Sequence, residues 1–258
     1  MDLDLKGKTA LVTGSYRGTG LIIAQTLIEE GVNTLVHGLK APQAEKAVTE
    51  LGGGIAITAD ITTQEGCEEL VELANGHSLD IIVNNYGTAD PNSWKEGGSG
   101  PWFGAYEKNV LSAQRITQGL MPALLKKKWG RVINLGTTGS TKPSRKNPAY
   151  YSAKGALVAM TVSLAGELAN TGVTANIVSP GLILTPEVKQ QLVDQSANKK
   201  EKATWEDIEA RVAKDIPIGR IVRREEVGNI IAFLCSPKAD AIHGQNIKVD
   251  GGALGIVS

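Results

Sequence analysis

The chain has 258 residues, of which 41% are hydrophobic and 21% are charged, as is usual for a globular protein with a large core. Its 27 basic and 27 acidic residues cancel, which argues against the positive surface of a nucleic-acid-binding protein. No apolar run is long enough to span a bilayer, and residues 1–6 leave no room for a signal peptide before the first strand. We therefore expect one domain over residues 1–258, in the cytoplasm and without nucleic-acid or membrane partners.

The cysteines and histidines show no spacing typical of metal ligands. Cys67 and Cys235 lie far apart inside helical patterns, which predicts buried free thiols rather than a disulfide. His37, His77 and His243 are equally scattered. The sequence therefore predicts no metal site.

The stretch from Lys8 to Ala24 predicts an apolar strand, a glycine-spaced turn and the start of a helix. Gly14, Gly18 and Gly20 give the turn the pattern T-G-x-x-x-G-x-G. Glycines let the backbone approach a pyrophosphate, and the N-terminus of the following helix attracts the anion. The turn therefore predicts a dinucleotide site, although a turn of this kind also serves helix-strand packing alone.

The second predicted strand, residues 33–37, bears on the identity of the dinucleotide. An acidic residue at its end would hold a ribose 2′-hydroxyl, but His37 to Lys40 include no carboxylate. Arg17 in the glycine turn and Lys40 after the strand can both reach a 2′-phosphate. This pattern favours NADP(H) over NAD(H), with two merely exposed charges as the alternative.

Helices and strands alternate through the next part of the chain, and the strands are apolar enough for a buried parallel sheet. The predicted elements are the helices 42–51 and 64–75 and the strands 55–59 and 80–83. Asp60 follows one strand, where it either caps the next helix or contacts the adenine. Asn84 and Asn85 close the other strand, where their amides either tie strand ends together or touch a ligand.

Residues 89–104 are interrupted by glycines and prolines, which is typical of a long functional or disordered loop. Its Trp94 and Trp102 are candidates for a substrate wall, with packing onto the core as the alternative. A helical pattern over 103–126 follows, with Asn109 inside it, and then a strand over 131–135.

Tyr150 and Lys154 lie four residues apart at the start of a helix predicted over 151–169, so they share one helix face. A free tyrosine has a pKa of about 10, and lowering it to about 7 takes roughly 4 kcal/mol. One cation at about 4 Å supplies energy of that order at an effective dielectric constant near 20. The pair can therefore provide a general acid near neutral pH.

Five motifs occur in one order over nearly the whole chain, and together they resemble those of the short-chain dehydrogenase/reductase family. They are Thr13-Gly14-x-x-x-Gly18-x-Gly20, Asn84-Asn85-x-Gly87, Tyr150-x-x-x-Lys154, Ser179-Pro180-Gly181 and the segment from Gly244 to Gly252. The resemblance implies an α/β fold, a Rossmann-type doubly wound sheet of about seven parallel strands with helices on both faces. It also implies a homotetramer or a homodimer.

The resemblance further implies a catalytic tetrad of Asn109, Thr137, Tyr150 and Lys154. Tyr150 would exchange a proton with the substrate oxygen while hydride passes between the nicotinamide and the carbon atom. Lys154 would lower the pKa of Tyr150 and hold the nicotinamide ribose, and Asn109 would hold a water in a proton relay.

The expected cofactor contacts come from the glycine turn, the ends of the next three strands, the tetrad and the segment after Ser179. They are Gly14, Tyr16, Arg17, Gly18, Thr19, Gly20, His37, Gly38, Lys40, Asp60, Ile61, Asn85, Gly87, Tyr150, Lys154, Pro180, Gly181, Ile183 and Thr185. Residues 182–217 would form a substrate lid, which either gates the site or packs on a neighbouring subunit.

Two residues depart from the family pattern. Thr137 stands where the family usually has serine; it keeps the hydroxyl but adds a methyl group and a stiffer side chain, and Thr138 is a rival for its role. Tyr86 replaces the usual alanine, and its ring can crowd the cofactor or the cleft.

We therefore predict an NADPH-dependent oxidoreductase that acts on a ketone or secondary alcohol, such as a 3-oxoacyl or another small carbonyl compound. An NAD-dependent alcohol dehydrogenase of the same fold and a non-catalytic nucleotide-binding sensor are the alternatives. A methyltransferase is disfavoured, because nothing in that chemistry requires the Tyr-x-x-x-Lys pair.

Overall fold

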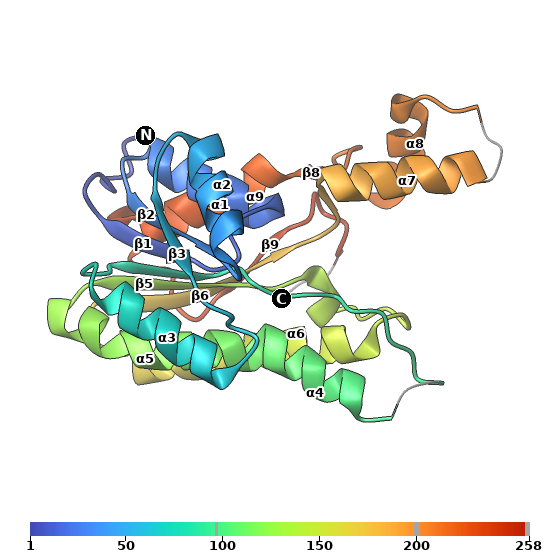
Figure 1. The fold of residues 1–258 in the computed structure, drawn as a ribbon. Coiled ribbons are helices and arrows are strands. Elements are labelled where there is room, and N and C mark those ends of the chain that lie inside the picture. The colour runs from blue at the N-terminus through green and yellow to red at the C-terminus, as the bar shows by residue number, and fades with distance from the viewer. Residues whose placement is uncertain (96–97, 199–201, 256–258) are drawn as a thin grey trace.

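A parallel sheet forms the centre of the computed structural model, which describes residues 1–95, 98–198 and 202–255. Within these ranges seven strands pair in the order β3, β2, β1, β4, β5, β6 and β9 (Figure 1). Their bounds are β1 (Thr9–Val12), β2 (Asn33–Gly38), β3 (Ile55–Thr58), β4 (Ile81–Asn84), β5 (Gly130–Leu135), β6 (Val173–Pro180) and β9 (Asn246–Val249). All pairs are parallel, which confirms the predicted Rossmann-type fold.

Helices cover both faces of the sheet (Figure 1). One face carries α1 (Gly18–Glu29), α2 (Ala41–Leu51) and α9 (Arg224–Cys235), and the other carries α3 (Gln64–Asn75), α5 (Ser112–Lys127) and α6 (Pro148–Glu167). Successive strand residues serve opposite layers: Leu11 and Ile82 belong to the core cluster beneath α3 and α5, whereas Val12 and Val83 belong to the cluster beneath α1 and α9.

The strand order reverses between β1 and β4, so the chain segments that follow these two strands diverge and leave room for a ligand at the carboxyl edge. Asn84 braces this point: its Nδ2 donates to Asn134 Oδ1 of β5 at 2.9 Å and to Thr117 Oγ1 of α5 at 2.8 Å. Asn134 Nδ2 in turn donates to Thr161 Oγ1 of α6 at 2.8 Å. Of the two roles left open for Asn84, these bonds show the structural one, since its amide ties the end of β4 to β5 and α5.

The helix predicted over 103–126 is in fact divided. It comprises α4 (Gly100–Tyr106), a single π-helical turn (Glu107–Leu111) and α5. The turn contains Asn109, and π-helical turns shift the side chains that follow relative to a regular helix.

Residues 182–217 begin with a strand too short to predict, β7 (Ile183–Leu184), which pairs with β8 (Val222–Arg223). The helices α7 (Pro186–Asn198) and α8 (Trp205–Val212) follow and project from the carboxyl edge of the sheet (Figure 1). Among the helices of the described ranges, none has the length and apolar character needed to cross a membrane.

Candidate active site

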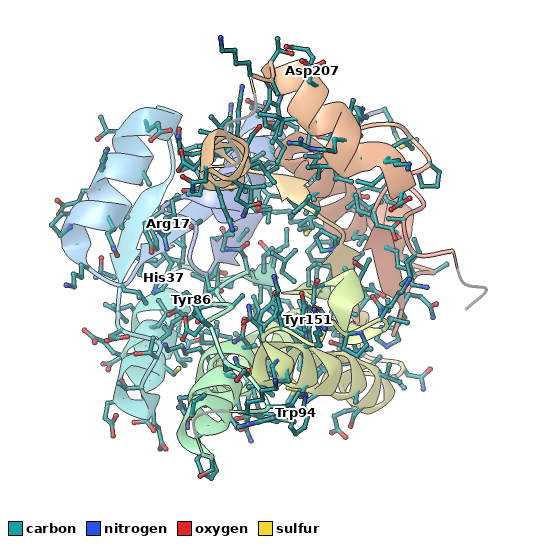
Figure 2. The ribbon with its side chains drawn as sticks, turned by 90° about the vertical axis from the view of Figure 1, so that its right-hand side faces the viewer. Arg17, His37, Tyr86, Trp94, Tyr151 and Asp207 are labelled. Atoms are coloured by element: carbon teal, nitrogen blue, oxygen red, sulfur yellow. The ribbon has the colours of Figure 1, made fainter. Side chains whose placement is uncertain are left out.

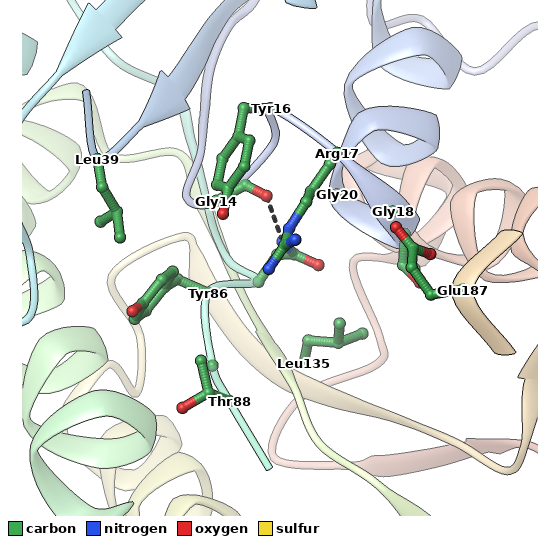
Figure 3. A pocket seen from close by; sticks show the side chains of 13 residues that line it. Gly14, Tyr16, Arg17, Gly18, Gly20, Leu39, Tyr86, Thr88, Leu135 and Glu187 are labelled. Carbon is green, nitrogen blue, oxygen red and sulfur yellow. Dashed lines mark hydrogen bonds between the residues drawn. The ribbon is translucent and has the colours of Figure 1, made fainter. Parts of the chain in front are cut away.

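A cavity of about 490 Å³ lies at the carboxyl edge, where the chain leaves β1 and β4 (Figure 3). Its lining residues are Gly14, Tyr16, Arg17, Gly18, Thr19, Gly20, Leu39, Asn85, Tyr86, Gly87, Thr88, Leu135 and Glu187. The predicted contacts of the glycine turn, together with Asn85 and Gly87, are all among them.

The glycine turn has the geometry that an anionic ligand requires. Gly14 and Gly18 adopt the left-handed backbone region with φ of 63° and 61°. A Cβ on Gly20 would lie 2.4 Å from Asn85 Nδ2, so no larger residue fits there. Helix α1 begins at Gly18 with no acidic residue in its first turn and no side-chain cap from Arg17, which leaves its N–H groups and positive dipole end for a ligand. These residues fit a dinucleotide diphosphate.

His37 lies beneath the glycine turn rather than in the cavity, so the predicted cofactor contact of its side chain is corrected. Its Nδ1 accepts a hydrogen bond from the Gly14 N–H at 2.9 Å, and its Nε2 lies 3.0 Å from the Ala59 carbonyl oxygen. This pairing requires the neutral ring with its hydrogen on Nε2. Burial lowers the pKa of His37 to about 4, against a weaker opposing effect of the Ala59 bond. The ring therefore fixes the glycine turn on β2 and β3.

Asn85 and Tyr86 hold the chain after β4 against the same turn. Asn85 Nδ2 donates to the carbonyl oxygens of Thr13 at 2.8 Å and Gly14 at 3.2 Å, and the Tyr86 N–H donates to Thr13 Oγ1 at 3.0 Å. The Tyr86 side chain packs so closely that a Cβ on Gly14 would lie 3.2 Å from it. Burial raises the pKa of Tyr86 to about 12, so its phenol stays neutral and narrows the cavity (Figure 3).

The other contacts predicted at the strand ends lie outside the cavity lining. Lys40 is exposed, and Gly38 is packed against the start of α2. Asp60 accepts hydrogen bonds from the backbone and hydroxyl two residues ahead, so it caps the turn before α3. The Ile61 side chain is fully buried in the core. Leu39, which the sequence analysis passed over as a contact, does line the cavity.

Lys154 lies on helix α6, which begins at Pro148, earlier than predicted, and so includes Tyr150. Neither of these two predicted cofactor contacts is among the lining residues of the cavity, but Lys154 packs directly behind two residues that are, Gly87 and Leu135. Lys154 is 3% exposed, and its Nζ donates to the Leu135 carbonyl oxygen at 2.7 Å. A Cβ on Gly87 would lie 3.0 Å from this Nζ and 2.4 Å from Asn109 Oδ1. Burial lowers the pKa of Lys154 to about 8. Gly87, Asn109 and Lys154 therefore meet at one point beside the cavity.

Asn109 presents an unused acceptor at this point. Its Nδ2 donates to the carbonyl oxygens of Thr88 and Ala105, both at 3.0 Å. Its Oδ1 is buried and has no hydrogen-bond partner among the described residues. Such an atom normally binds a polar partner, as the predicted water relay requires.

Tyr150 is buried, and this raises its pKa to about 12, with its neighbour Tyr151 as the second cause. The two rings meet edge to face with centroids 5.3 Å apart. We expected Lys154 to lower the pKa of Tyr150, and that expectation is corrected: both causes of the shift, burial and Tyr151, raise the pKa, and Lys154 is not among them. The phenol is therefore protonated at neutral pH, which is the state of a general acid.

Thr137 follows β5 with its hydroxyl positioned as a donor. Its Oγ1 accepts a hydrogen bond from the Gly139 N–H at 3.2 Å, which leaves the hydroxyl hydrogen for another acceptor. The Ser140 hydroxyl donates to the Thr137 carbonyl oxygen at 2.7 Å and fixes the backbone there. Neither Thr137 nor Thr138 is among the lining residues of the cavity, and the assignment of Thr137 as the polarising hydroxyl stays a prediction.

The loop after Gly87 supplies a cap for the catalytic helix, a function that the sequence did not suggest. Asn92 Oδ1 accepts from the Ala149 N–H at 3.0 Å in the first turn of α6. The Asn147 N–H donates to the Asn92 carbonyl oxygen at 3.2 Å, and the Asn92 N–H donates to Asn147 Oδ1 at 3.3 Å. These bonds tie the loop to the start of the helix that carries Tyr150.

The two tryptophans of this loop region take different positions. Trp102 packs against Ala149 and Ala153 of α6, whereas Trp94 is 74% exposed. Their ring centroids lie 5.1 Å apart. Figure 2, which looks onto the carboxyl edge, shows Arg17 and Tyr86 on one side, Tyr151 on the other and Trp94 below them. Trp102 therefore belongs to the core, and Trp94 remains the candidate for a substrate wall.

The cofactor contacts predicted after Ser179 are not among the residues that line the cavity. Gly181, which follows Pro180, is packed against Asp250, and Ile183 belongs to β7. Thr185 immediately precedes α7, and its Oγ1 accepts a hydrogen bond from the Val188 N–H in the first turn at 3.2 Å. The residue of this segment that does line the cavity is Glu187, which the sequence analysis missed.

No metal centre is evident in the described part of the chain. No group of three or more His, Cys, Asp or Glu side chains there is arranged to hold an ion. Cys67 and Cys235 are both buried and free, as predicted.

The sheet, the glycine turn and the Tyr150–Lys154 helix beside one cavity define a nicotinamide-dependent oxidoreductase. A family model described as Enoyl-(Acyl carrier protein) reductase matches residues 14–253. The chain belongs to the short-chain dehydrogenase/reductase family and is an oxidoreductase that acts on carbonyl or alcohol groups.

Individual relatives match over nearly the full length. D-beta-hydroxybutyrate dehydrogenase of Cupriavidus necator is 35% identical, covering 96% of this chain and 98% of its own. A 3-oxoacyl-(acyl-carrier-protein) reductase of Haemophilus influenzae is 32% identical, with coverage of 96% and 98%. The crystal structure of L-sorbose reductase from Gluconobacter frateurii, complexed with NADPH and L-sorbose, is 30% identical and covers 100% of both chains with a TM-score of 0.93.

Proposed function

We propose that the protein is an NADPH-dependent reductase that converts a ketone, either a 3-oxoacyl compound or another small carbonyl compound, into the secondary alcohol, and that it can run in reverse. One observation carries this proposal. Gly87 lines the cavity together with the glycine turn, and it packs directly against Asn109 and Lys154. A dinucleotide held by the turn would thus lie next to the proton-transfer residues.

The glycine turn and Arg17 would hold the nicotinamide dinucleotide, whose chemistry when bound would be hydride transfer to the carbonyl carbon. The Tyr150 phenol is protonated at neutral pH, as a tyrosine with an ordinary or a raised pKa is, and donates its proton to the carbonyl oxygen, so that carbon and oxygen each gain one hydrogen and an alcohol forms. The Thr137 hydroxyl donates a hydrogen bond to the same oxygen and polarises it. The Lys154 ammonium stabilises the phenolate that develops, and Asn109 Oδ1 orients the water that returns a proton.

Arg17 supports the preference for NADPH, because it lines the cavity and the end of β2 offers no carboxylate to a ribose hydroxyl. Lys40 lies outside the lining, so we assign it a minor share. Arg17→Ala is expected to reduce the ratio of kcat/KM for NADPH over NADH by about tenfold or more, as the loss of a charged hydrogen bond implies. Lys40→Ala should change that ratio little. Equal or better turnover of the wild type with NADH would make the protein an NAD-dependent dehydrogenase instead.

The names of the relatives point to 3-oxoacyl thioesters, short 3-hydroxy acids and ketoses as the first substrates to test. The assay is NADPH oxidation over such a panel, with NADP⁺ reduction by the matching alcohols. Tight NADPH binding without turnover of any compound would favour a non-catalytic nucleotide sensor.

We further propose that residues 182–217 act as a substrate lid and that the chain forms a homotetramer or a homodimer, both on the basis of the family resemblance. The mass of the protein in solution, measured by light scattering, tests the proposed oligomeric state, because it gives the number of chains in each particle. Limited proteolysis with and without NADPH tests the proposed lid, because residues 182–217 should become protected from cleavage when the cofactor binds.

A further inference from the structure

Among the residues that line the cavity, Glu187 is the one with a carboxylate, and it stands where an anionic cofactor is expected. It comes from the first turn of α7 and shares the cavity wall with Arg17 and Gly18. Figure 3 shows it on the side opposite Leu39 and Tyr86. A negative charge at this position opposes the binding of a diphosphate.

The Glu187 carboxylate has defined partners. Its own backbone N–H, the Thr185 hydroxyl and the positive charges of Arg17 and Arg224 all favour its ionised form. Together these contacts hold the pKa of the Glu187 carboxyl below its usual value. The side chain is therefore ionised at neutral pH.

Arg17 and Arg224 place two positive charges beside the glycine turn. Arg224, from the first turn of α9, donates from Nη1 to the Gly18 carbonyl oxygen at 3.3 Å. Arg17 lines the cavity itself. Neither guanidinium forms an ion pair with a carboxylate among the described residues. Their charge is thus available to a diphosphate, except for the share that Glu187 offsets.

We propose that Glu187 determines how tightly the cleft holds its dinucleotide. Its carboxylate competes with the cofactor's diphosphate for the positive charge of Arg17 and Arg224. The lid segment thereby carries a built-in competitor, which limits affinity and favours cofactor exchange. This inference rests on the proposed function, because it presumes that a nicotinamide dinucleotide binds here.

The test is the Kd of NADPH for the full chain, measured by the change in NADPH fluorescence on titration. Glu187→Gln removes the charge and keeps the size, and Glu187→Ala removes the charge and the hydrogen bonds. Both are expected to lower the Kd by about three- to tenfold at low salt, the range that one partly screened charge supplies. The gain should shrink at high sodium chloride, because Glu187 is exposed.

Asp194→Asn is the matched control, since Asp194 lies two turns further along α7, bonds to Gln190 and does not line the cavity. Its Kd should equal that of the wild type. An unchanged or weaker Kd in Glu187→Gln, or equal tightening in Asp194→Asn, would overturn the inference. If the wild type binds neither NADPH nor NADH, it is the proposed function that fails.

Discussion

The two halves of the cleft are built differently. In the cofactor half, His37 is fully buried and the glycine turn is held by side-chain bonds from His37 and Asn85. In the substrate half, Trp94 is 74% and Phe103 72% exposed, and helices α7 and α8 project from the body. Buried polar networks fix one geometry, whereas exposed loops tolerate many. The cofactor half therefore defines the family, and the substrate half defines the individual enzyme.

The largest effect should come from Tyr150, on which both halves converge. Tyr150→Phe removes the proton donor while keeping the ring, so we expect kcat for carbonyl reduction to fall by about a thousandfold. The Kd of NADPH should stay close to that of the wild type. Tyr151→Phe is the matched control and should keep most of the activity. Comparable losses in the two variants would remove Tyr150 from its assigned role.

The rigidity of the cofactor half should depend on pH through His37. Its pKa is about 4 in the folded chain and 6.5 for the unperturbed residue, so its contribution to stability is complete above about pH 6.5 and is lost as the pH falls toward 4. The difference corresponds to about 3 kcal/mol of unfolding free energy. Denaturant titrations at several pH values measure it.

His37→Gln should be less stable at neutral pH and should flatten that pH dependence, because it removes the titrating ring. His77→Gln, at an exposed histidine, is the control and should follow the wild type. An unchanged acid slope in His37→Gln would show that other groups set the acid limit of stability.

Substitutions of Thr137 test whether the hydroxyl that polarises the carbonyl comes from this residue. Thr137→Val keeps the shape but removes the donor, and kcat/KM should fall by about a hundredfold, as for the loss of other oxyanion donors. Thr137→Ser should retain most of the activity. If Thr138→Val shows the large loss and Thr137→Val does not, the role passes to Thr138.

The smallest effect is expected in the substrate half. Trp94→Ala should raise KM for the carbonyl substrate by about two- to fivefold, because one exposed ring supplies a modest part of a binding surface. KM for NADPH should not change. A shift in both constants would show that the two halves are coupled through the loop.

Sequence alone could predict those parts that depend on local spacing. The glycine turn, the Tyr150–Lys154 face and helix α3 at 64–75 follow from short-range patterns, and the structure has α3 at those bounds. The π-helical turn around Asn109 was not predictable, because the amphipathic pattern runs through it unbroken. Strand β7 was missed because a strand of two residues is too short to show the alternation of apolar and polar residues by which strands are predicted.

The parts of the site that depend on long-range packing were also missed. Nothing in the sequence indicates that the His37 ring lies under Gly14, or that burial and Tyr151, rather than Lys154, set the pKa of Tyr150. Glu187 had one usable signal: it is an acidic residue in the first turn of a helix that begins at Pro186, just after Thr185. Its place in the cavity wall depends on the path of the chain after β6.

Asn92 makes the loop that bears Trp94 and the helix that bears Tyr150 one mechanical unit. Anyone who exchanges this loop with that of a relative, in order to change which ketone is accepted, would also exchange the anchor of the helix. A graft that keeps Asn92 and its three bonds to Asn147 and Ala149 should preserve turnover while altering selectivity. A graft that lacks Asn92 would displace the Tyr150 phenol, and the resulting loss of activity would be mistaken for a failure to bind the new ketone.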